Sequence, residues 1–339
     1  MEEKSERIVS TGKKHGAKSF FSSWEFALAI IFIAVSVFCR AISPNYTPGN
    51  VLREMPKYLG EMFLLFPMAF ILLMGDIDIS VGSIVCLSAT VSCFACNAGL
   101  PIPVVVLIGL LVGLLCGMLN GFILTTFVEL PAMIVTLGTQ IVYRGIAEIV
   151  LGSGGSISLK DTSGFNALAG KIGPFPYLFF LVILFAVAFA VVSAKTPFGR
   201  SLYAIGSNHN AAFYSGVKVQ RVRFIVFSVT GAMAGLCAVF LTSTLFGANT
   251  TTGNGFEMDA IAMAVFGGIS TAGGKGRLAG GIISAFIIIC LRIGLGQINM
   301  NPQIILIILG ILLITAVLVP NVSSKINARN TKNKVLTRK

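Results

Sequence analysis

Long apolar runs constrain this chain more than any other feature of its sequence. A helix that crosses a bilayer needs about 20 mostly apolar residues, and ten stretches approach or meet that length. They cover residues 24–42, 58–74, 81–98, 103–124, 131–150, 174–194, 223–246, 258–271, 278–296 and 302–320. Hydrophobic residues form 55% of the 339-residue chain and charged residues 11%, far below the roughly one-quarter of a soluble domain. We therefore expect an all-α, polytopic membrane protein with about ten transmembrane helices.

The basic residues gather in three polar segments, at 1–23, 195–223 and 321–339, which hold 16 of the 25 lysines and arginines. The positive-inside rule places such segments in the cytoplasm. The net charge of +12 therefore reports orientation rather than a nucleic-acid partner. We expect a cytoplasmic N-terminal segment (1–23), a transmembrane domain (24–320) with one large inner loop (195–223), and a cytoplasmic tail (321–339).

Two of the apolar runs, 58–74 and 258–271, are short and lead into glycine-rich segments. The first stops at "GDIDISVGS" (75–83) and the second at "ISTAGGKGRLAGG" (269–281). Short or interrupted segments at matching places in two halves often mark the binding site of a transporter. This pattern predicts two inverted halves, about 24–150 and 175–320, each with a broken helix. The alternative is a pair of ordinary loops.

Charge within the apolar runs is sparse. Asp76 and Asp78, if ionised at mid-membrane depth, would cost about 5 to 7 kcal/mol on the insertion scale, so we expect them at a membrane face or in a protected functional site. Arg144 and Glu148 stand four residues apart on one predicted helix, where they can pair. The absence of a ladder of carboxylates in the sequence disfavours a proton- or sodium-coupled carrier. Uncharged polar residues suit a neutral, hydroxyl-rich solute, and the pathway candidates are Asn120, Thr136, Thr139, Gln140, Gln297 and Asn299.

Several chemistries are disfavoured by the residues present. The two histidines, His15 and His209, lie in basic segments, so neither an intramembrane metal cluster nor a Ser–His–Asp arrangement is expected. In "GGISTAGGKGR", Gly276 follows Lys275 where a phosphate-binding loop needs Ser or Thr, and Ile269 replaces its first glycine. We expect no catalytic residues, no metal and no cofactor in this chain, and any ATP must be bound by another polypeptide.

The inner loop carries an apolar pattern from 210 to 217 among basic and polar residues. This pattern is typical of a short amphipathic helix on the membrane surface. A soluble partner is one candidate to bind it, and anionic lipid headgroups are the alternative.

Six motifs now occur in a recognisable order. They are "GDIDISVGS", "PAMIVTLGT" followed by "YRG", "TPFGRSLYAIGSN", "AAFYSGVKVQRVR", "GFEMDAIAMAVFGG" and "AGGKGRLAGG". Over residues 24–320 the chain resembles the permease subunits of bacterial ABC sugar importers of the ribose, galactose, xylose and autoinducer-2 kind. Six ordered motifs are far more specific than any one of them.

The resemblance implies a transport subunit of the bacterial inner membrane rather than an enzyme. Its partners would be a second permease copy, identical or related, a cytoplasmic ABC ATPase, an extracytoplasmic substrate-binding protein and a small sugar. A nucleoside or branched-chain amino acid permease is the nearest alternative. An ion-coupled secondary carrier and a membrane-embedded enzyme are further ones.

The resemblance also assigns roles to two groups of residues. In the E-A-A-x-x-x-G pattern of the helix that couples a permease to its ATPase, Ala211, Ala212 and Gly216 match, whereas Asn210 replaces the usual Glu. A second motif, at a helix break, comprises Gly75, Asp76, Asp78, Ser80 and Gly82.

In the helix-break motif we expect a structural or gating role, with the carboxylates capping N–H groups of the next helix. Direct contact with a sugar is the alternative. Glu257 and Asp259 follow a polar external loop, and they are candidates to cap helix 258–271 or to meet the binding protein.

Overall fold

A computed structural model describes residues 24–301, 303–312 and 314–315 of the chain. Within these residues, seven helices are long and apolar enough to cross a membrane, which confirms the all-α prediction. They are α2 (Trp24–Ile42), the adjoining α4 (Pro56–Leu59) and α5 (Met62–Met74) counted as one, α7 (Ile102–Thr126), α8 (Ala132–Leu151), α10 (Tyr177–Lys195), α13 (Val219–Leu245) and α15 (Leu278–Gln297).

Each of the other three predicted runs also contains a helix, but a shorter one. These helices are α6 (Val81–Asn97), α14 (Phe256–Phe266) and the stretch Gln303–Leu312. The predicted segments 1–23 and 321–339, and part of the run 302–320, lie outside the described residues.

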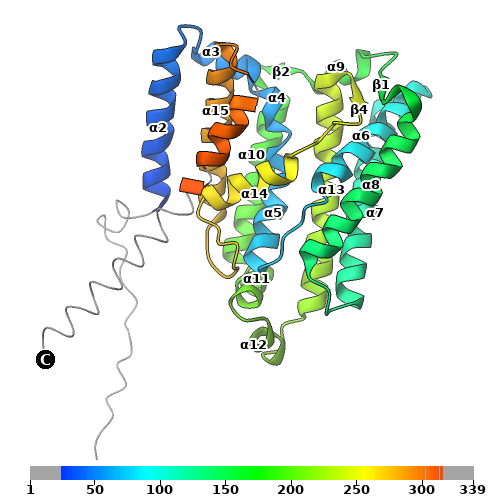
Figure 1. Ribbon diagram of the computed structural model, residues 1–339, viewed down its shortest axis with the longest axis vertical. Helices are drawn as coiled ribbons and strands as arrows, with labels where there is room; N and C mark the ends of the chain where they lie inside the picture. Colours follow the sequence, from blue (N-terminus) through cyan, green and yellow to red (C-terminus); the bar gives the residue numbers. More distant parts are fainter. Residues whose placement is uncertain (1–23, 302, 313, 316–339) are drawn as a thin grey trace, which may run out of the picture.

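Helix α5 forms the centre of the bundle (Figure 1). All of its side chains are buried, as expected for a helix that is apolar on every face. It ends at Gly75, whose φ of +83° lies in the left-handed region and lets its N–H bond to the carbonyls of Ile71 and Leu72. The chain then runs through residues 76–80 before α6 begins at Val81. The first predicted helix break is therefore present.

The second predicted break lies around α14. After α13 the chain forms strand β4 (Gly247–Asn249), which pairs antiparallel with β1 (Ser156–Ser158), and α14 begins after a further turn. The helix has only 11 residues and a glycine-rich loop joins it to α15. A Cβ atom on Gly82 would lie 2.4 Å from the carbonyl oxygen of Gly253, so the two broken elements meet. Their relation as inverted repeats stays a prediction.

Glycine rows allow α7 and α13 to pack backbone to backbone. A Cβ atom on Gly113 would lie 2.2 Å from the carbonyl oxygen of Gly231, and one on Gly117 would lie 2.4 Å from that of Phe227. Either would clash. These glycine rows, spaced as G-x-x-x-G, thus serve helix packing.

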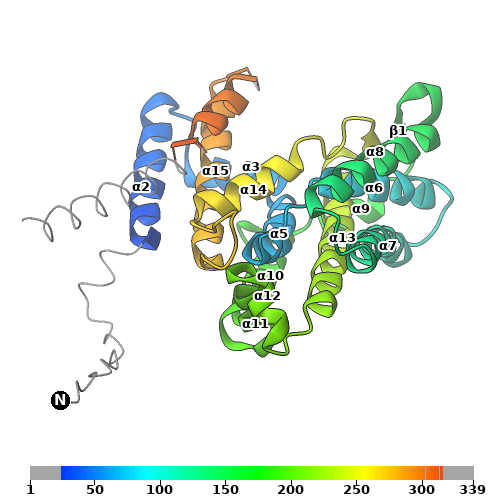
Figure 2. The same ribbon diagram turned by 60° about the horizontal axis from the view of Figure 1, so that its bottom comes forward.

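Short elements cover the two ends of the bundle. At one end lie α11 (Pro197–Ser207) and α12 (His209–Tyr214), at the bottom of Figure 1 and turned forward in Figure 2. At the other end lie α3 (Pro48–Glu54), α9 (Ser163–Leu168), the β1–β4 pair, and the β2 (Lys171–Ile172)–β3 (Phe175–Pro176) pair. The inner loop predicted from its charge therefore forms one distinct end of the molecule.

Candidate functional site

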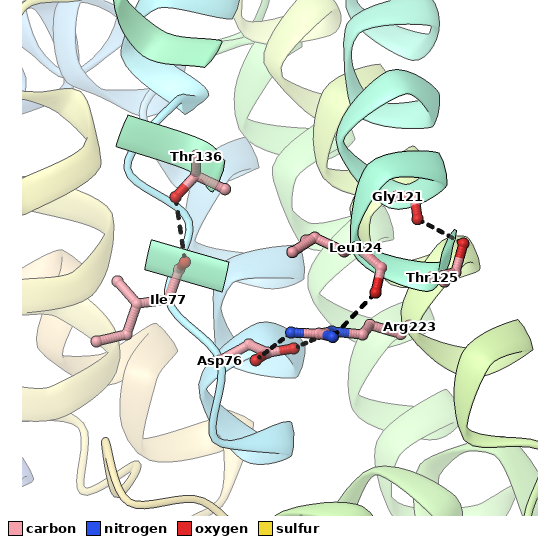
Figure 3. A network of polar contacts seen from close by, with 7 residues as sticks. All are labelled: Asp76, Ile77, Gly121, Leu124, Thr125, Thr136 and Arg223. Carbon is pink, nitrogen blue, oxygen red and sulfur yellow. Dashed lines mark hydrogen bonds and ion pairs between the residues drawn. The ribbon is translucent and has the colours of Figure 1, made fainter. Parts of the chain in front are cut away.

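Asp76 lies in the break after α5 and binds Arg223 of α13 (Figure 3). The Arg223 Nε donates to Asp76 Oδ2 at 2.7 Å and its Nη2 donates to Oδ1 at 2.9 Å. The remaining Nη1 donates to the carbonyl of Leu124 at 3.1 Å. Two parallel charge-assisted bonds are the strongest form of such a pair. The expectation that Asp76 caps the next helix is wrong: its oxygens accept from Arg223, and no side-chain hydrogen bond caps the described helix α6.

Asp78 is buried and folds back on its own segment. Its Oδ1 accepts hydrogen bonds from the backbone N–H of Ser80 at 2.8 Å and from the Ser80 hydroxyl at 2.7 Å. This Asx turn sets the entry into α6, yet it bonds the residue before the helix and not a helical N–H. Among the described residues, the other oxygen, Oδ2, has no hydrogen-bond partner.

Two of the predicted pathway residues hold the break in place. The amide of Asn120 donates to the Ser80 hydroxyl at 2.8 Å and accepts from the hydroxyl of Tyr143 at 2.9 Å. The hydroxyl of Thr136 accepts from the Ile79 N–H at 3.2 Å and contacts the Ile77 carbonyl at 3.4 Å (Figure 3). Both Asn120 and Thr136 are fully buried. They anchor the segment between α5 and α6 to α7 and α8.

The other pathway candidates are not brought together. Thr139 is buried and bonds within its own helix, and Gln140 is half-buried on α8. Gln297, by contrast, ends α15 and accepts from the hydroxyl of Ser43 at 3.5 Å. Asn299 follows in the turn, with a φ of +54°. These last two lie at the end of the bundle opposite α12, away from the break.

Arg292 of α15 links Asp259 of α14 to Glu61, the residue that precedes α5. Its Nη1 donates to Glu61 at 2.8 Å and its Nη2 donates to Asp259 at 2.6 Å. Sequence reasoning identified neither this triad nor Glu61. Glu257, on the same helix as Asp259, is buried, and its Oε2 faces the Cα of Gly82 and lacks a hydrogen-bond partner within the described chain.

Arg144 does not form the predicted pair with Glu148 in the described structure. Its Nη1 donates instead to the carbonyls of Thr250 and Thr252, at 2.9 and 2.8 Å. Arg144 thereby supplies hydrogen-bond donors to two backbone carbonyls in the non-helical segment that precedes α14. Glu148 is exposed.

The predicted amphipathic stretch forms α12 up to Tyr214, and a second helix, α11, precedes it. The Oδ1 of Asn208 accepts from the Ala211 N–H at 2.9 Å and so caps α12. Ala212 is buried against the bundle, whereas the side chains of Phe213 and Tyr214 are 60% and 86% exposed. Gly216 ends the turn with a φ of +85°. Asn210 is exposed beside them.

A cavity of about 400 Å³ lies between the helix break and α12. It brings residues of the break motif and of the predicted coupling segment to one place. Its lining residues are Met74, Asp76, Val128, Glu129, Leu130, Pro131, Ile205, His209, Asn210, Val219 and Arg223.

Comparison with known proteins places this geometry in context. A family model described as "Branched-chain amino acid transport system / permease component" matches residues 63–317. The chain is 36% identical to the ribose import permease protein RbsC of Bacillus subtilis (strain 168) over 293 residues, which cover 86% of this chain and 89% of that protein.

Two further relatives have a similar match. The D-allose transport system permease protein AlsC of Escherichia coli (strain K12) is 33% identical over 329 residues, 94% of this chain and 98% of that protein. The autoinducer 2 import system permease protein LsrC of Photorhabdus laumondii is 39% identical over 230 residues, 66% of this chain and 67% of that protein. No solved structure matches.

Proposed function

Since the chain belongs to the permease-component family of ABC importers, we propose that it is the membrane-spanning subunit of an ATP-driven importer of a monosaccharide or a similar small polar solute. It works as a pair of permease copies with a cytoplasmic ATPase and an extracytoplasmic binding protein. The exposed position of α12, next to the break after α5, is the observation that carries this proposal.

Helix α12 is the surface on which the ATPase docks. Phe213 and Tyr214 present large aromatic side chains outward, and the burial of one such side chain contributes about 1.5–3 kcal/mol. The small Ala211 lets a partner approach the helix closely. Because Asn210 stands where this pattern usually has Glu, the contact depends on packing rather than on a carboxylate.

The end that carries α11 and α12 faces the cytoplasm. Exposed basic side chains surround it, at Lys195, Arg200, Lys218 and Arg221, as the positive-inside rule requires. Of the ten apolar runs in the sequence, six precede this loop and four follow it, so both chain termini face the cytoplasm as well.

The helix break from Gly75 to Gly82 is the element that rearranges during transport. It has no regular backbone ladder of its own, and side chains from α7, α8 and α13 hold it. Non-helical backbone at membrane depth is tolerated where it is buried in protein or lines a cavity. Breaking the Asp76–Arg223 ion pair would free this segment to move and would alter the solute pathway beside it.

Two experiments test the proposal. The purified permease is reconstituted with its ATPase and its binding protein, and ATP-dependent uptake of labelled ribose, allose and leucine is measured. We expect uptake of a monosaccharide. Uptake of leucine alone would overturn the substrate class and favour the branched-chain amino acid activity in the family model's description.

The docking surface is tested separately by cysteine cross-linking. Tyr214→Cys should cross-link to the ATPase, whereas Lys57→Cys, at the opposite end of the bundle, should not. A cross-link at position 57 without one at position 214 would contradict the assignment of α12.

A further inference from the structure

Helix α11 contacts the inner ends of both broken elements at one junction. The backbone N–H of Gly274, in the loop between α14 and α15, donates to the carbonyl of Leu73 at the end of α5, at 2.9 Å. Gly206 of α11 lies against both of these residues. A Cβ atom there would be 1.9 Å from the Leu73 oxygen and 2.4 Å from the Gly274 nitrogen. Three backbones therefore meet with no space for a side chain.

The loop after α14 is shaped to fit this junction. Gly273 has a φ of +84°, and a Cβ atom on it would lie 2.9 Å from the Cα of Gly206 and 3.0 Å from that of Gly75. The loop closes on itself through the Ser270 N–H, which donates to the Lys275 carbonyl at 3.0 Å. It is thus a folded unit that can transmit a displacement rather than absorb it.

A side-chain hydrogen bond joins α11 to the far side of the same loop. The hydroxyl of Tyr203 donates to the carbonyl of Gly276 at 2.9 Å. Tyr203 and Gly206 stand three residues apart and so share one face of the helix. Leu202 and Ile205 are buried on the same element, so α11 is seated firmly on the bundle.

We infer that Tyr203 and Gly206 are the coupling residues that pass a movement of α12 to both helix breaks at once. Asn208 ends α11 and caps α12, so the two helices share a single residue between them. A displacement of α12 therefore moves α11. Through Gly206 it reaches the end of α5 and the Asp76 segment, and through Tyr203 it reaches the loop that follows α14. This inference rests on the proposed docking of the ATPase on α12.

A coupling role and a purely structural role differ in one measurable ratio. If the junction only stabilises the fold, variants will lower ATP hydrolysis and uptake in proportion to the amount of folded complex. If it couples, the assembled complex will still hydrolyse ATP while the solute transported per ATP falls. The ratio of uptake to hydrolysis separates the two.

The test uses Gly206→Ala and Tyr203→Phe in the full complex of permease, ATPase and binding protein in proteoliposomes. We expect Gly206→Ala to assemble normally and to lower uptake per ATP at least about tenfold, since a clash with backbone oxygen forces the junction apart. Tyr203→Phe removes one hydrogen bond and should lower the ratio about threefold to tenfold. If Gly206→Ala does not fold, Tyr203→Phe decides the question.

Two controls match the variants. Gly296→Ala adds the same methyl group to a helical glycine with open space around it, and Ser201→Ala removes a hydroxyl of α11 that bonds only within its helix, to Pro197. Both should leave the ratio unchanged. An unchanged ratio in Tyr203→Phe would overturn the inference while leaving the docking of α12 intact. Absence of the Tyr214→Cys cross-link in the otherwise wild-type complex would instead overturn the proposed docking of the ATPase on α12.

Discussion

The Asp76–Arg223 pair gives the sharpest quantitative prediction. At an effective dielectric constant of about 20, unit charges about 4 Å apart attract by about 4 kcal/mol. The Arg223 side chain is 9% exposed and that of Asp76 is 19% exposed, so solvent screens part of this attraction. Breaking a buried pair by removing one partner typically costs about 3–5 kcal/mol. We expect Asp76→Asn to destabilise the protein by about 3 kcal/mol, at the lower end of this range, because solvent screens part of the attraction.

The double variant Asp76→Asn/Arg223→Gln isolates the interaction. Because it leaves neither charge unpaired, it should cost about 2 kcal/mol less than the sum of the single changes. The assay is reversible unfolding in mixed micelles by added SDS, followed by far-UV circular dichroism. The exposed Lys57–Glu54 pair supplies the control, where Lys57→Gln should cost less than about 1 kcal/mol. Additive effects, or a cost below about 1 kcal/mol for Asp76→Asn, would refute the reasoning.

Three other changes test separate parts of the structure. Gly82→Val should reduce uptake and destabilise the fold by about 1–3 kcal/mol, because its Cβ would lie 2.3 Å from Glu257 Oε2. The control Gly138→Val, at a glycine with open space around it, should do neither. Unfolding followed by far-UV circular dichroism measures the stability, and a transport assay measures the uptake. Gly216→Leu forces a bulky residue into a φ of +85° at a cost of about 1–3 kcal/mol, and we expect a folded permease without ATPase coupling, checked by hydrolysis and uptake. Arg292→Gln leaves the buried Glu61 and the half-buried Asp259 unpaired and should destabilise the protein by about 3 kcal/mol. A free energy of unfolding within about 1 kcal/mol of the wild type would contradict the role of the triad.

Local patterns predicted the helices because the signals that define them are local. Apolar runs of sufficient length placed the spans, and Gly75 marked the end of α5 because its left-handed φ favours glycine. The G-x-x-x-G spacing of glycines in α7 is typical of close helix packing but does not identify the partner helix. That partner, α13, lies more than 100 residues along the chain, a distance that no local pattern records.

The polar contacts of the site depend on such long-range neighbours. Arg223 was counted among the basic residues of the inner loop, yet it lies in the first turns of α13 and turns inward to Asp76. The run 278–296 contains no acidic residue that could pair with Arg292, and Arg292 binds Glu61, 231 residues away. The Arg144–Glu148 spacing predicted an intrahelical pair, but backbone carbonyls of a distant segment compete for the guanidinium.

The coupling segment was predicted in position but not in form. The apolar pattern indicated one helix at 210–217, whereas the structure has α12 and the preceding α11. A sequence signal for α11 exists in "TPFGRS", where Thr196 caps the helix and Pro197 opens it. The sequence did not predict the role of α11 at the glycine junction, because the close approach of Gly75, Gly206 and Gly273 is known only from the folded structure.

Transport through this permease depends on a separate ATPase, and an uptake assay with the permease alone tests this dependence most directly. Proteoliposomes that contain only this chain, with the labelled solute outside and an imposed proton or sodium gradient, should accumulate none. Addition of the ATPase, the binding protein and ATP should start accumulation. Uptake driven by an ion gradient in the absence of the ATPase would contradict the account.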